Sequence, residues 1–123
     1  MTEVVGRSTE GATSSNVGGG AVRYLAPEFI EDSNAFATTG SDTFSFGMLM
    51  LECTTEEAPF SDITSDAAVF DVRIAGVRYP PRPDGPDPES RVPDVLWELM
   101  SCCWLAKCKS RPTMEQVHEL LSQ

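Results

Sequence analysis

The sequence has no excess of basic charge and no long apolar run. Nine Lys and Arg side chains stand against nineteen Asp and Glu, which gives a formal net charge of −10 for 123 residues. Nucleic acids and anionic membranes both require a basic face, so we predict neither as the main partner. The longest strongly apolar segment, FSFGMLMLEC at 44–53, is shorter than the roughly 20 residues that cross a bilayer. The N-terminus has no signal-peptide pattern, and we predict a cytoplasmic, intracellular protein.

Cysteine and histidine are too few and too poorly spaced to predict a metal site. The candidate ligands are Cys102, Cys103, Cys108 and His118. Adjacent cysteines point in different directions on a helix, and the sequence contains no C-x2-C pair. We therefore predict reduced thiols and no metal, with Cys53 as a small buried hydrophobe within an apolar helix.

The sequence does contain apolar patterns of helical period. Residues 41–54 are apolar in nearly every direction around a helix axis, which predicts a buried central helix with Ser41 or Asp42 as its cap. A helix of about ten residues is predicted to begin at Ser65 or Asp66 and to stop at Gly76. Its predicted inward-facing residues are Val69, Val72 and Ile74.

Two more helices are predicted near the C-terminus. Residues 94–104 place six side chains on one face: Val95, Leu96, Leu99, Met100, Cys103 and Trp104. The last helix begins at a capping box formed by Thr113 and Gln116. Its apolar positions are Met114, Val117, Leu120 and Leu121, which leaves His118 on the surface. The proline-rich residues 79–93 read as a connector.

Residues 1–20 are rich in Gly, Ser and Thr and have no apolar period, which predicts a flexible tail. Their three final glycines are not a phosphate-binding loop, because no Gly-Lys-Ser/Thr follows them.

Four motifs in order resemble the C-terminal lobe of a eukaryotic protein kinase. They are RYLAPE (23–28), SDTFSFGMLMLE (41–52), APF (58–60) and CW…RPT (103–113). The SFG and CW…RPT features are most similar to the tyrosine-kinase-like group, whose sequences also resemble serine/threonine kinases. The resemblance implies a mainly α fold, namely a kinase C-lobe helical subdomain of about four to five helices without the β-rich N-lobe. It implies that 21–123 form a partial kinase domain and that 1–20 resemble part of an activation segment.

The resemblance also implies structural roles for four residues. In the family, the glutamate of Ala-Pro-Glu pairs with an arginine at the far end of the lobe, and here these residues are Glu28 and Arg111. A bidentate Arg–carboxylate pair suits a partly buried link between distant segments. Asp42 matches the aspartate that bonds back to the catalytic-loop backbone, and Trp104 matches the tryptophan that packs near the arginine.

A substrate-facing loop and phosphorylation sites are implied in the same way. The loop consists of Gly20, Ala21, Val22, Arg23 and Tyr24. Ala21 stands where serine/threonine kinases usually have Thr and tyrosine kinases usually have Pro. Lys107-Cys108 stands where the family usually has Asp-Pro, just before the arginine at the end of the lobe. The candidate phosphorylation sites are Ser8, Thr9, Thr13, Ser14 and Ser15. Ordinary serines and threonines in a disordered tail are the alternative.

The catalytic parts of the family are missing from the sequence. Kinases use ATP and Mg²⁺, held by a Gly-rich loop, a strand lysine, His-Arg-Asp and Asp-Phe-Gly, and none of these motifs occurs here. We therefore expect no catalytic, cofactor-binding or metal-binding residue in this chain, no bound cofactor, and a chain that is inert alone. The alternatives are a pseudokinase-like module that binds a protein or peptide, or self-associates, through apolar surface around Leu49 and Cys53, and a helical protein unrelated to kinases.

Overall fold

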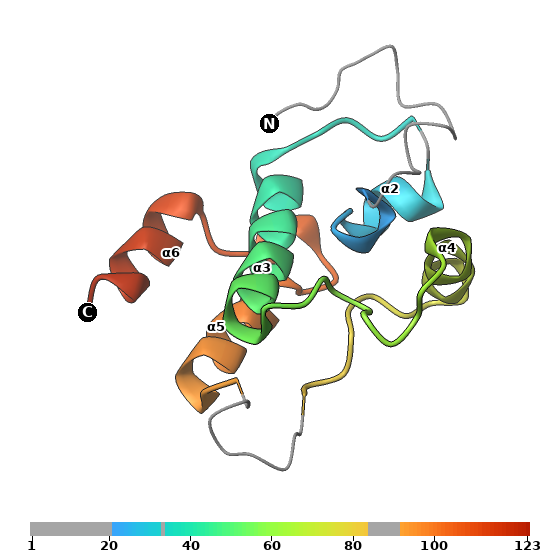
Figure 1. The fold of residues 1–123 in the computed structure, drawn as a ribbon. Coiled ribbons are helices and arrows are strands. Elements are labelled where there is room, and N and C mark those ends of the chain that lie inside the picture. The colour runs from blue at the N-terminus through green and yellow to red at the C-terminus, as the bar shows by residue number, and fades with distance from the viewer. Residues whose placement is uncertain (1–20, 33, 84–91) are drawn as a thin grey trace.

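The computed structural model describes residues 21–32, 34–83 and 92–123. The predicted flexible tail, the five candidate phosphorylation sites and Gly20 lie outside these residues. Within the described part every regular element is a helix, which confirms the mainly α class (Figure 1). In chain order the elements are the 3-10 helix η1 (Ala21–Arg23), α2 (Pro27–Glu31), α3 (Thr39–Thr55), α4 (Asp66–Ile74), α5 (Asp94–Cys103), the 3-10 helix η3 (Cys108–Ser110) and α6 (Met114–Leu121).

Helix α3 is the predicted central helix, and it begins earlier than the sequence indicated. Its N-cap is Thr38, whose side chain accepts a hydrogen bond from the Ser41 backbone N–H, while the Ser41 side chain accepts one from the Thr38 backbone. This capping box corrects the prediction that Ser41 or Asp42 is the cap. Ser41 fills the N3 position of the box, and Asp42 is exposed in the first turn.

The core lies between α3 and α5, with the Trp104 side chain fully buried at its centre. The Trp104 ring stacks on Tyr79 at 4.9 Å between centroids and meets Trp97 edge-on at 5.4 Å. Phe44 of α3 completes the cluster at 6.4 Å. Aromatic pairs at these separations add to the free energy gained by burial, so the predicted position of Trp104 in the core is correct.

The outer face of α3 is not buried. Leu49 is 47% exposed and Cys53 is also exposed, so the prediction of a buried Cys53 is wrong. The reason is geometric: α5 packs against α3, and Leu49 and Cys53 are left exposed. Cys103, on the inner face of α5, is the fully buried cysteine instead.

Helices α4 and α5 have the predicted extents, but each buries a narrower face. Val69 is fully buried, whereas Ile74 is 58% exposed and Arg73 lies inside. A residue four positions after Val69 shares its face, and the next residue is turned about 100° away. For the same reason Val95, one position before the inner face of α5 begins, is 77% exposed. The predicted stop at Gly76 is present, with φ +117°.

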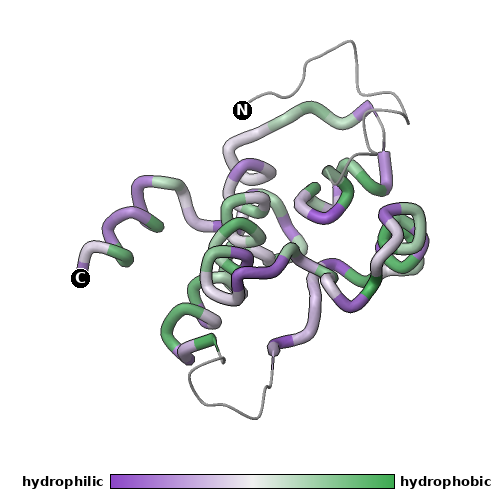
Figure 2. The backbone as a smooth tube through the Cα atoms, viewed as in Figure 1, coloured by the Kyte–Doolittle hydropathy of each residue, from purple (hydrophilic) through white to green (hydrophobic). Residues whose placement is uncertain are grey.

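Helix α6 starts at the predicted capping box of Thr113 and Gln116. It projects from the rest of the described chain (Figure 1), and Figure 2 shows apolar and polar residues alternating along it. Of its four predicted apolar contacts only Val117 is buried, while the other three are exposed: Met114, Leu120 and Leu121. His118 is on the surface, as predicted. Among the described residues, none of the helices combines the length and apolar composition that a bilayer crossing requires.

Candidate functional site

Residues 21–31, which include η1 and α2, are joined to distant parts of the described chain by side-chain hydrogen bonds. We call this stretch the anchored segment. It lies beside α3 and α4 in Figure 1. Three arginine side chains from different parts of the chain hold it: Arg23, Arg73 and Arg111.

Arg111 binds the C-terminal part of the anchored segment. Its side chain is fully buried, and its Nη1 and Nη2 donate to Glu28 Oε2 at 2.9 Å and Oε1 at 3.0 Å. The same guanidinium donates to the carbonyls of Gly40 at 3.1 Å and Leu105 at 2.8 Å, and it lies 5.0 Å from the centroid of the Phe44 ring. The link between Glu28 and Arg111 that the kinase resemblance implied is therefore present as a bidentate pair.

The environment of Glu28 sets the balance of two opposing effects on its pKa. Partial burial raises the pKa, while the hydrogen bonds and the charge of Arg111 lower it. Burial is the largest single effect, but the lowering effects, which also include hydrogen bonds from the backbone and from Cys108, together outweigh it, so the pKa of Glu28 lies below its usual value of 4.5. The carboxylate is charged at neutral pH, as a bidentate pair requires.

Arg23 anchors the segment from within. Its Nε donates to Asp66 Oδ1 at 2.8 Å, and its two other nitrogens donate to the carbonyls of Pro59, Phe60 and Ile63 at 2.8–3.0 Å. The predicted substrate-facing role of Arg23 is not what the structure shows, because the side chain is buried against the loop that precedes α4. An arginine in a kinase-like loop is read from sequence as exposed, and only the fold reveals the carbonyl oxygens that surround it.

The other members of the predicted substrate-facing loop divide between inside and outside. Val22 is buried, while Ala21 is exposed and Tyr24 is half-buried. The Tyr24 hydroxyl donates to the Glu52 carboxylate, and the Ser45 hydroxyl donates to the Tyr24 carbonyl at 2.9 Å. Burial, followed by the hydrogen bond and the charge of Glu52, raises the pKa of Tyr24 to about 12. Among the described residues of this loop, only the side chains of Ala21 and Tyr24 are therefore exposed or half-buried.

Arg73 is an anchor that the sequence reading missed. Its Nη1 donates to the carbonyls of Val22, at 3.0 Å, and Leu25, and its Nη2 donates to Arg78 O at 2.8 Å. The residue is 4% exposed, and burial lowers its pKa to about 10 despite the nearby charge of Glu28. Its guanidinium ties the start of the anchored segment to the turn after α4.

One sequence signal could have found Arg73. It stands four residues after Val69, on the apolar face of a short helix, where a charged side chain is buried only when it is paired or hydrogen-bonded. The carbonyl groups that satisfy it are 48 and 51 residues away in the chain. No local pattern identifies them.

Two further contacts join α3 to the corner that contains Arg111. The Thr43 hydroxyl donates to Pro112 O at 3.0 Å, and the Cys108 sulfur lies 3.0 Å from Thr38 Oγ1. Cys108 thus takes part in the corner where the family usually has Asp-Pro. Asp42, for which the resemblance implied a bond to the catalytic loop, is exposed and has no side-chain hydrogen bond to any described residue.

The described residues do not fit the cofactors of the kinase family. They contain no group of three or more His, Cys, Asp or Glu side chains that could hold a metal ion. One cavity, of about 310 Å³, is an open groove between α2 and the end of α4, lined by Pro27, Ile30, Glu31, Arg73, Ile74, Gly76, Val77 and Arg78. It has no glycine-rich loop and no lysine beside a glutamate to hold ATP with Mg²⁺. The arrangement holds residues 21–31 in place against the helices through buried arginine side chains.

Three features together define a kinase-type C-lobe: the helical architecture, the partly buried Glu28–Arg111 pair and the loop held against the helices. Comparison with known proteins leads to the same family. The profile of the family described as protein tyrosine and serine/threonine kinase matches residues 2–121, and this chain belongs to that family. Similar proteins include human receptor-interacting serine/threonine-protein kinase 1, 29% identical over 92% of this chain and 16% of the relative. Human receptor-interacting serine/threonine-protein kinase 3 is 33% identical over 88% of this chain and 21% of the relative.

A third relative, from Dictyostelium discoideum, carries the name of a probable inactive serine/threonine-protein kinase. It is 35% identical over 81% of this chain and 5% of its own length. The chain therefore spans about a fifth or less of each of these three relatives.

Proposed function

We propose that this chain forms the substrate-side part of a protein kinase C-lobe and does not transfer phosphate by itself. The observation that carries the proposal is the contrast between two features. The loop next to the family's substrate is held by three buried arginines. The residues that would bind nucleotide, Mg²⁺ and the attacking hydroxyl are missing from the sequence.

The free thiols support an intracellular, cytoplasmic setting for this function. All four cysteines are free, and two of them, Cys53 and Cys102, are exposed. Reduced cysteines of this kind are typical of the cytosol. Nucleic acid and membranes are not proposed as partners, because the net charge of −10 repels both.

Thermal unfolding in the presence of Mg-ATP tests the proposal that this chain does not transfer phosphate by itself. A ligand that binds only the folded state raises the melting temperature by mass action. We expect no shift when millimolar Mg-ATP is added, in a titration where an active protein kinase domain serves as the positive control. A shift that saturates with nucleotide would show a nucleotide site and overturn the proposal.

A second candidate function is a module that binds a protein partner through its exposed apolar surface. The observation that favours it is the outer face of α3 and the projecting helix α6, where Leu49, Met114, Leu120 and Leu121 are between 38% and 50% exposed. Contiguous exposed apolar surface is typical of interaction sites. The alternative is that a second copy of this chain covers the same surface. Sedimentation over a wide concentration range would detect this self-association.

A further inference from the structure

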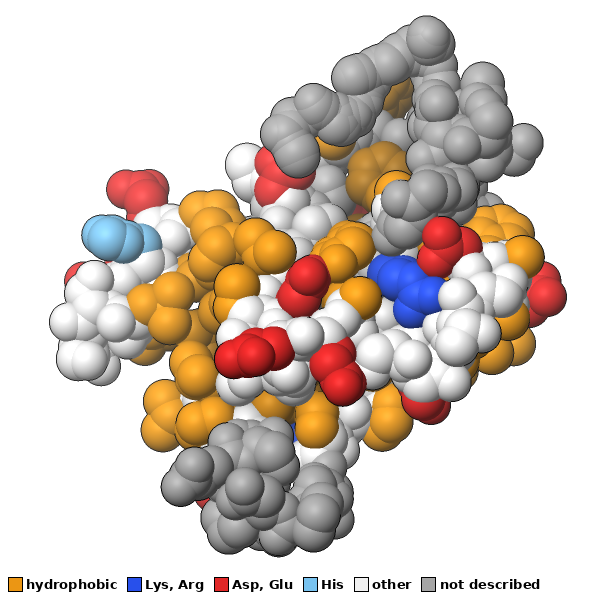
Figure 3. Space-filling model, in the orientation of Figure 1, with side chains coloured by type: hydrophobic (Ala, Val, Ile, Leu, Met, Phe, Trp, Pro, Cys, Tyr) orange, Lys and Arg blue, Asp and Glu red, His pale blue; other side chains and the backbone are white. Residues whose placement is uncertain are grey.

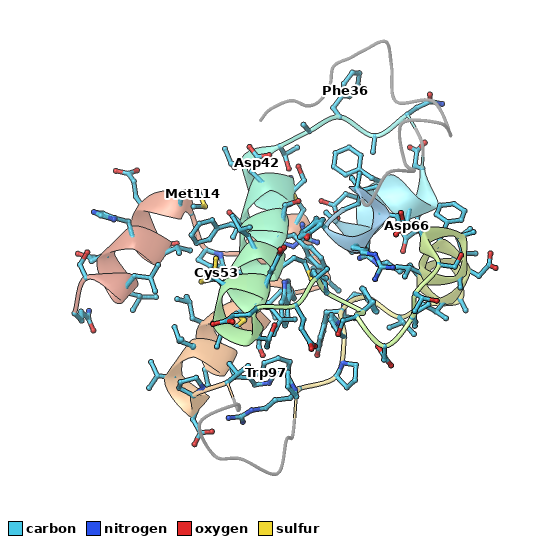
Figure 4. All side chains as sticks on the ribbon, in the orientation of Figure 1. Phe36, Asp42, Cys53, Asp66, Trp97 and Met114 are labelled. Carbon is cyan, nitrogen blue, oxygen red and sulfur yellow. The ribbon has the colours of Figure 1, made fainter. Side chains whose placement is uncertain are left out.

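The groove between α2 and the end of α4 continues beyond the cavity described above. A second hollow, of about 240 Å³, extends it to Glu28 and Ala106. Figure 4 shows Asp66 at the start of α4, so the groove lies at the opposite end of that helix from the Arg23–Asp66 ion pair. We call the two hollows together the α2–α4 groove. Four residues line both hollows: Pro27, Glu31, Gly76 and Arg78.

The first hollow is apolar and small. Ile30 beside it is half-buried, while Ile74 and Val77 at its edge are 58% and 43% exposed. Pockets that hold small molecules usually measure about 300–1,000 Å³, so a hollow of about 310 Å³ suits one large apolar side chain better than a nucleotide. Gly76 lines both hollows without a side chain, and an added Cβ there would meet no atom within 4 Å. An extended backbone can therefore approach the chain closely at this point.

The charge balance of the α2–α4 groove is opposite to that of the whole chain, which carries a net charge of −10. In the groove, Arg111 neutralises Glu28, which leaves the carboxylate of Glu31 against the guanidiniums of Arg73 and Arg78. Arg73 donates to carbonyls and has no carboxylate partner among the described residues. On the face drawn in Figure 3, acidic side chains are spread widely and the basic surface lies towards α4.

Arg78 is the cation of the groove that a ligand can reach. Its side chain is exposed and forms no hydrogen bond or ion pair with any other described residue, and its guanidinium lies 5.6 Å from the centroid of the Tyr79 ring. Its backbone is held in place, since the Arg78 carbonyl accepts a hydrogen bond of 2.8 Å from Arg73. The planar fork of donors on an arginine matches a carboxylate. The groove therefore places an apolar hollow beside a site for an acidic group.

We propose that the α2–α4 groove binds a short, extended segment of a partner protein in which an aromatic residue lies within two positions of an Asp or Glu. The aromatic side chain enters the first hollow against Ile74 and Val77, and the carboxylate pairs with Arg78. The short spacing follows because Arg78 lines both hollows and residues of an extended chain are only about 3.4 Å apart. Charge complementarity selects such a segment among apolar ones. Binding at this groove requires neither a nucleotide nor the exposed surfaces of α3 and α6, so it goes beyond both functions proposed above.

A second copy of this chain does not match the groove. The aromatic side chain that it would offer is Phe36, which is 88% exposed on the loop between α2 and α3 (Figure 4). Residues 34–38 contain no Asp or Glu, so no carboxylate lies within two positions of Phe36. Two copies that each carry a net charge of −10 also repel each other. The occupant is therefore a different protein.

Binding of labelled peptides to the full chain tests the proposal. Each probe has about nine residues, which extend over roughly 30 Å, with Phe at the centre and Gly or Ser at most other positions. One probe has Glu two positions after the Phe and the other has Glu two positions before it, because the groove accepts an extended chain in either direction. The controls replace the Glu by Lys or the Phe by Ser. Fluorescence anisotropy should show that at least one probe binds and that each of its controls binds at least about tenfold more weakly.

Variants locate the contact and separate a charge effect from a loss of folding. Arg78→Glu should weaken the better probe about tenfold and strengthen its lysine control by a similar factor, whereas unfolding would weaken both peptides. Ile74→Ser should weaken the probe about fivefold. Lys109→Glu is the matched control, because Lys109 is exposed and lines neither hollow, and it should change binding by less than about twofold. Circular dichroism checks that each variant is folded.

Three results would overturn the proposal. The first is that neither probe binds, or that a probe and its lysine control bind equally. The second is binding that Arg78→Glu and Ile74→Ser leave unchanged. The third is self-association in sedimentation that Phe36→Ser and Ile74→Ser both abolish, because the occupant would then be a second copy. None of these results bears on the response to Mg-ATP, so the proposal of a C-lobe that does not transfer phosphate stands or fails separately.

Discussion

Arg111 and Glu28 are 83 residues apart in the chain, yet two hydrogen bonds of 2.9 and 3.0 Å join their side chains. The arginine is fully buried on its side-chain atoms and the glutamate is about one quarter exposed, at 27%. Arg111 also donates hydrogen bonds to the backbone carbonyls of Gly40 and Leu105. One guanidinium therefore holds the anchored segment, the start of α3 and the end of the α5 region together.

Replacing Arg111 by methionine should destabilise the fold by about 3–5 kcal/mol, because the partner carboxylate and two carbonyls lose their donor in a shielded site. Urea unfolding of Arg111→Met, Glu28→Gln and the double variant measures the coupling between the two side chains. The double variant should lose less than the sum of the single losses. Additive losses would mean that the pair contributes no coupling energy.

The same pair predicts a pH dependence. The folded-state pKa of Glu28 is below its usual value of 4.5, so the ionised form stabilises the fold above that pH. This stability is lost as the pH falls from about 4.5 through the lower, folded-state pKa. The difference in free energy of unfolding between the natural chain and Glu28→Gln should therefore shrink across this acidic range. A difference that stays constant would contradict the assignment.

Arg73→Lys should destabilise the chain by about 2–3 kcal/mol, although the charge is kept. One ammonium group cannot reach the carbonyls of Val22, Leu25 and Arg78 together, and a buried carbonyl left without a donor is costly. Arg78→Lys is the matched control, because Arg78 is exposed, and it should change stability by less than about 0.5 kcal/mol. Equal effects at the two positions would remove Arg73 from the set of anchors.

Tyr24 predicts a second pH dependence, at alkaline pH. Its pKa is raised from 10.0 to about 12 in the fold, so the neutral phenol stabilises the fold below pH 10 and this stability is lost as the pH rises towards 12. Spectroscopic titration of tyrosinate should detect this group as a component near pH 12, and Tyr24→Phe should remove that component and leave the signal of Tyr79, the second tyrosine. Glu52→Gln should lower the pKa, since Glu52 accepts the phenolic hydrogen bond.

Gly47→Ala should destabilise the core by about 1–3 kcal/mol. An added Cβ would lie 2.6 Å from Trp104 Nε1 and 3.0 Å from Cys103 Cβ, although alanine is the better helix former. Cys53→Ala, on the exposed face of the same helix, is the control and should be close to neutral. If Gly47→Ala were stabilising, the close packing of α3 on Trp104 would be refuted.

Much of the fold could be predicted from local pattern. Apolar periodicity predicted α3, α4, α5 and α6 but not the short helix α2, and the Thr113–Gln116 capping box marked the start of α6. Errors arose where a neighbouring element decides burial. Cys53 was expected inside and is exposed, while Ile74 and Val95 lie one position away from the faces that are buried. Periodicity states which residues share a face, and the tertiary arrangement decides which face is covered.

The site divides in the same way. Ordered motifs alone were enough to indicate the family and to pair Glu28 with Arg111. Only the tertiary structure turned Arg23 inward and showed Arg73 as an anchor, because the carbonyl groups that satisfy these guanidiniums come from segments 36–51 residues away. A sequence specifies which side chains can donate hydrogen bonds, and the fold decides which distant backbone acceptors are brought to them, since a buried donor is tolerated only where such an acceptor arrives.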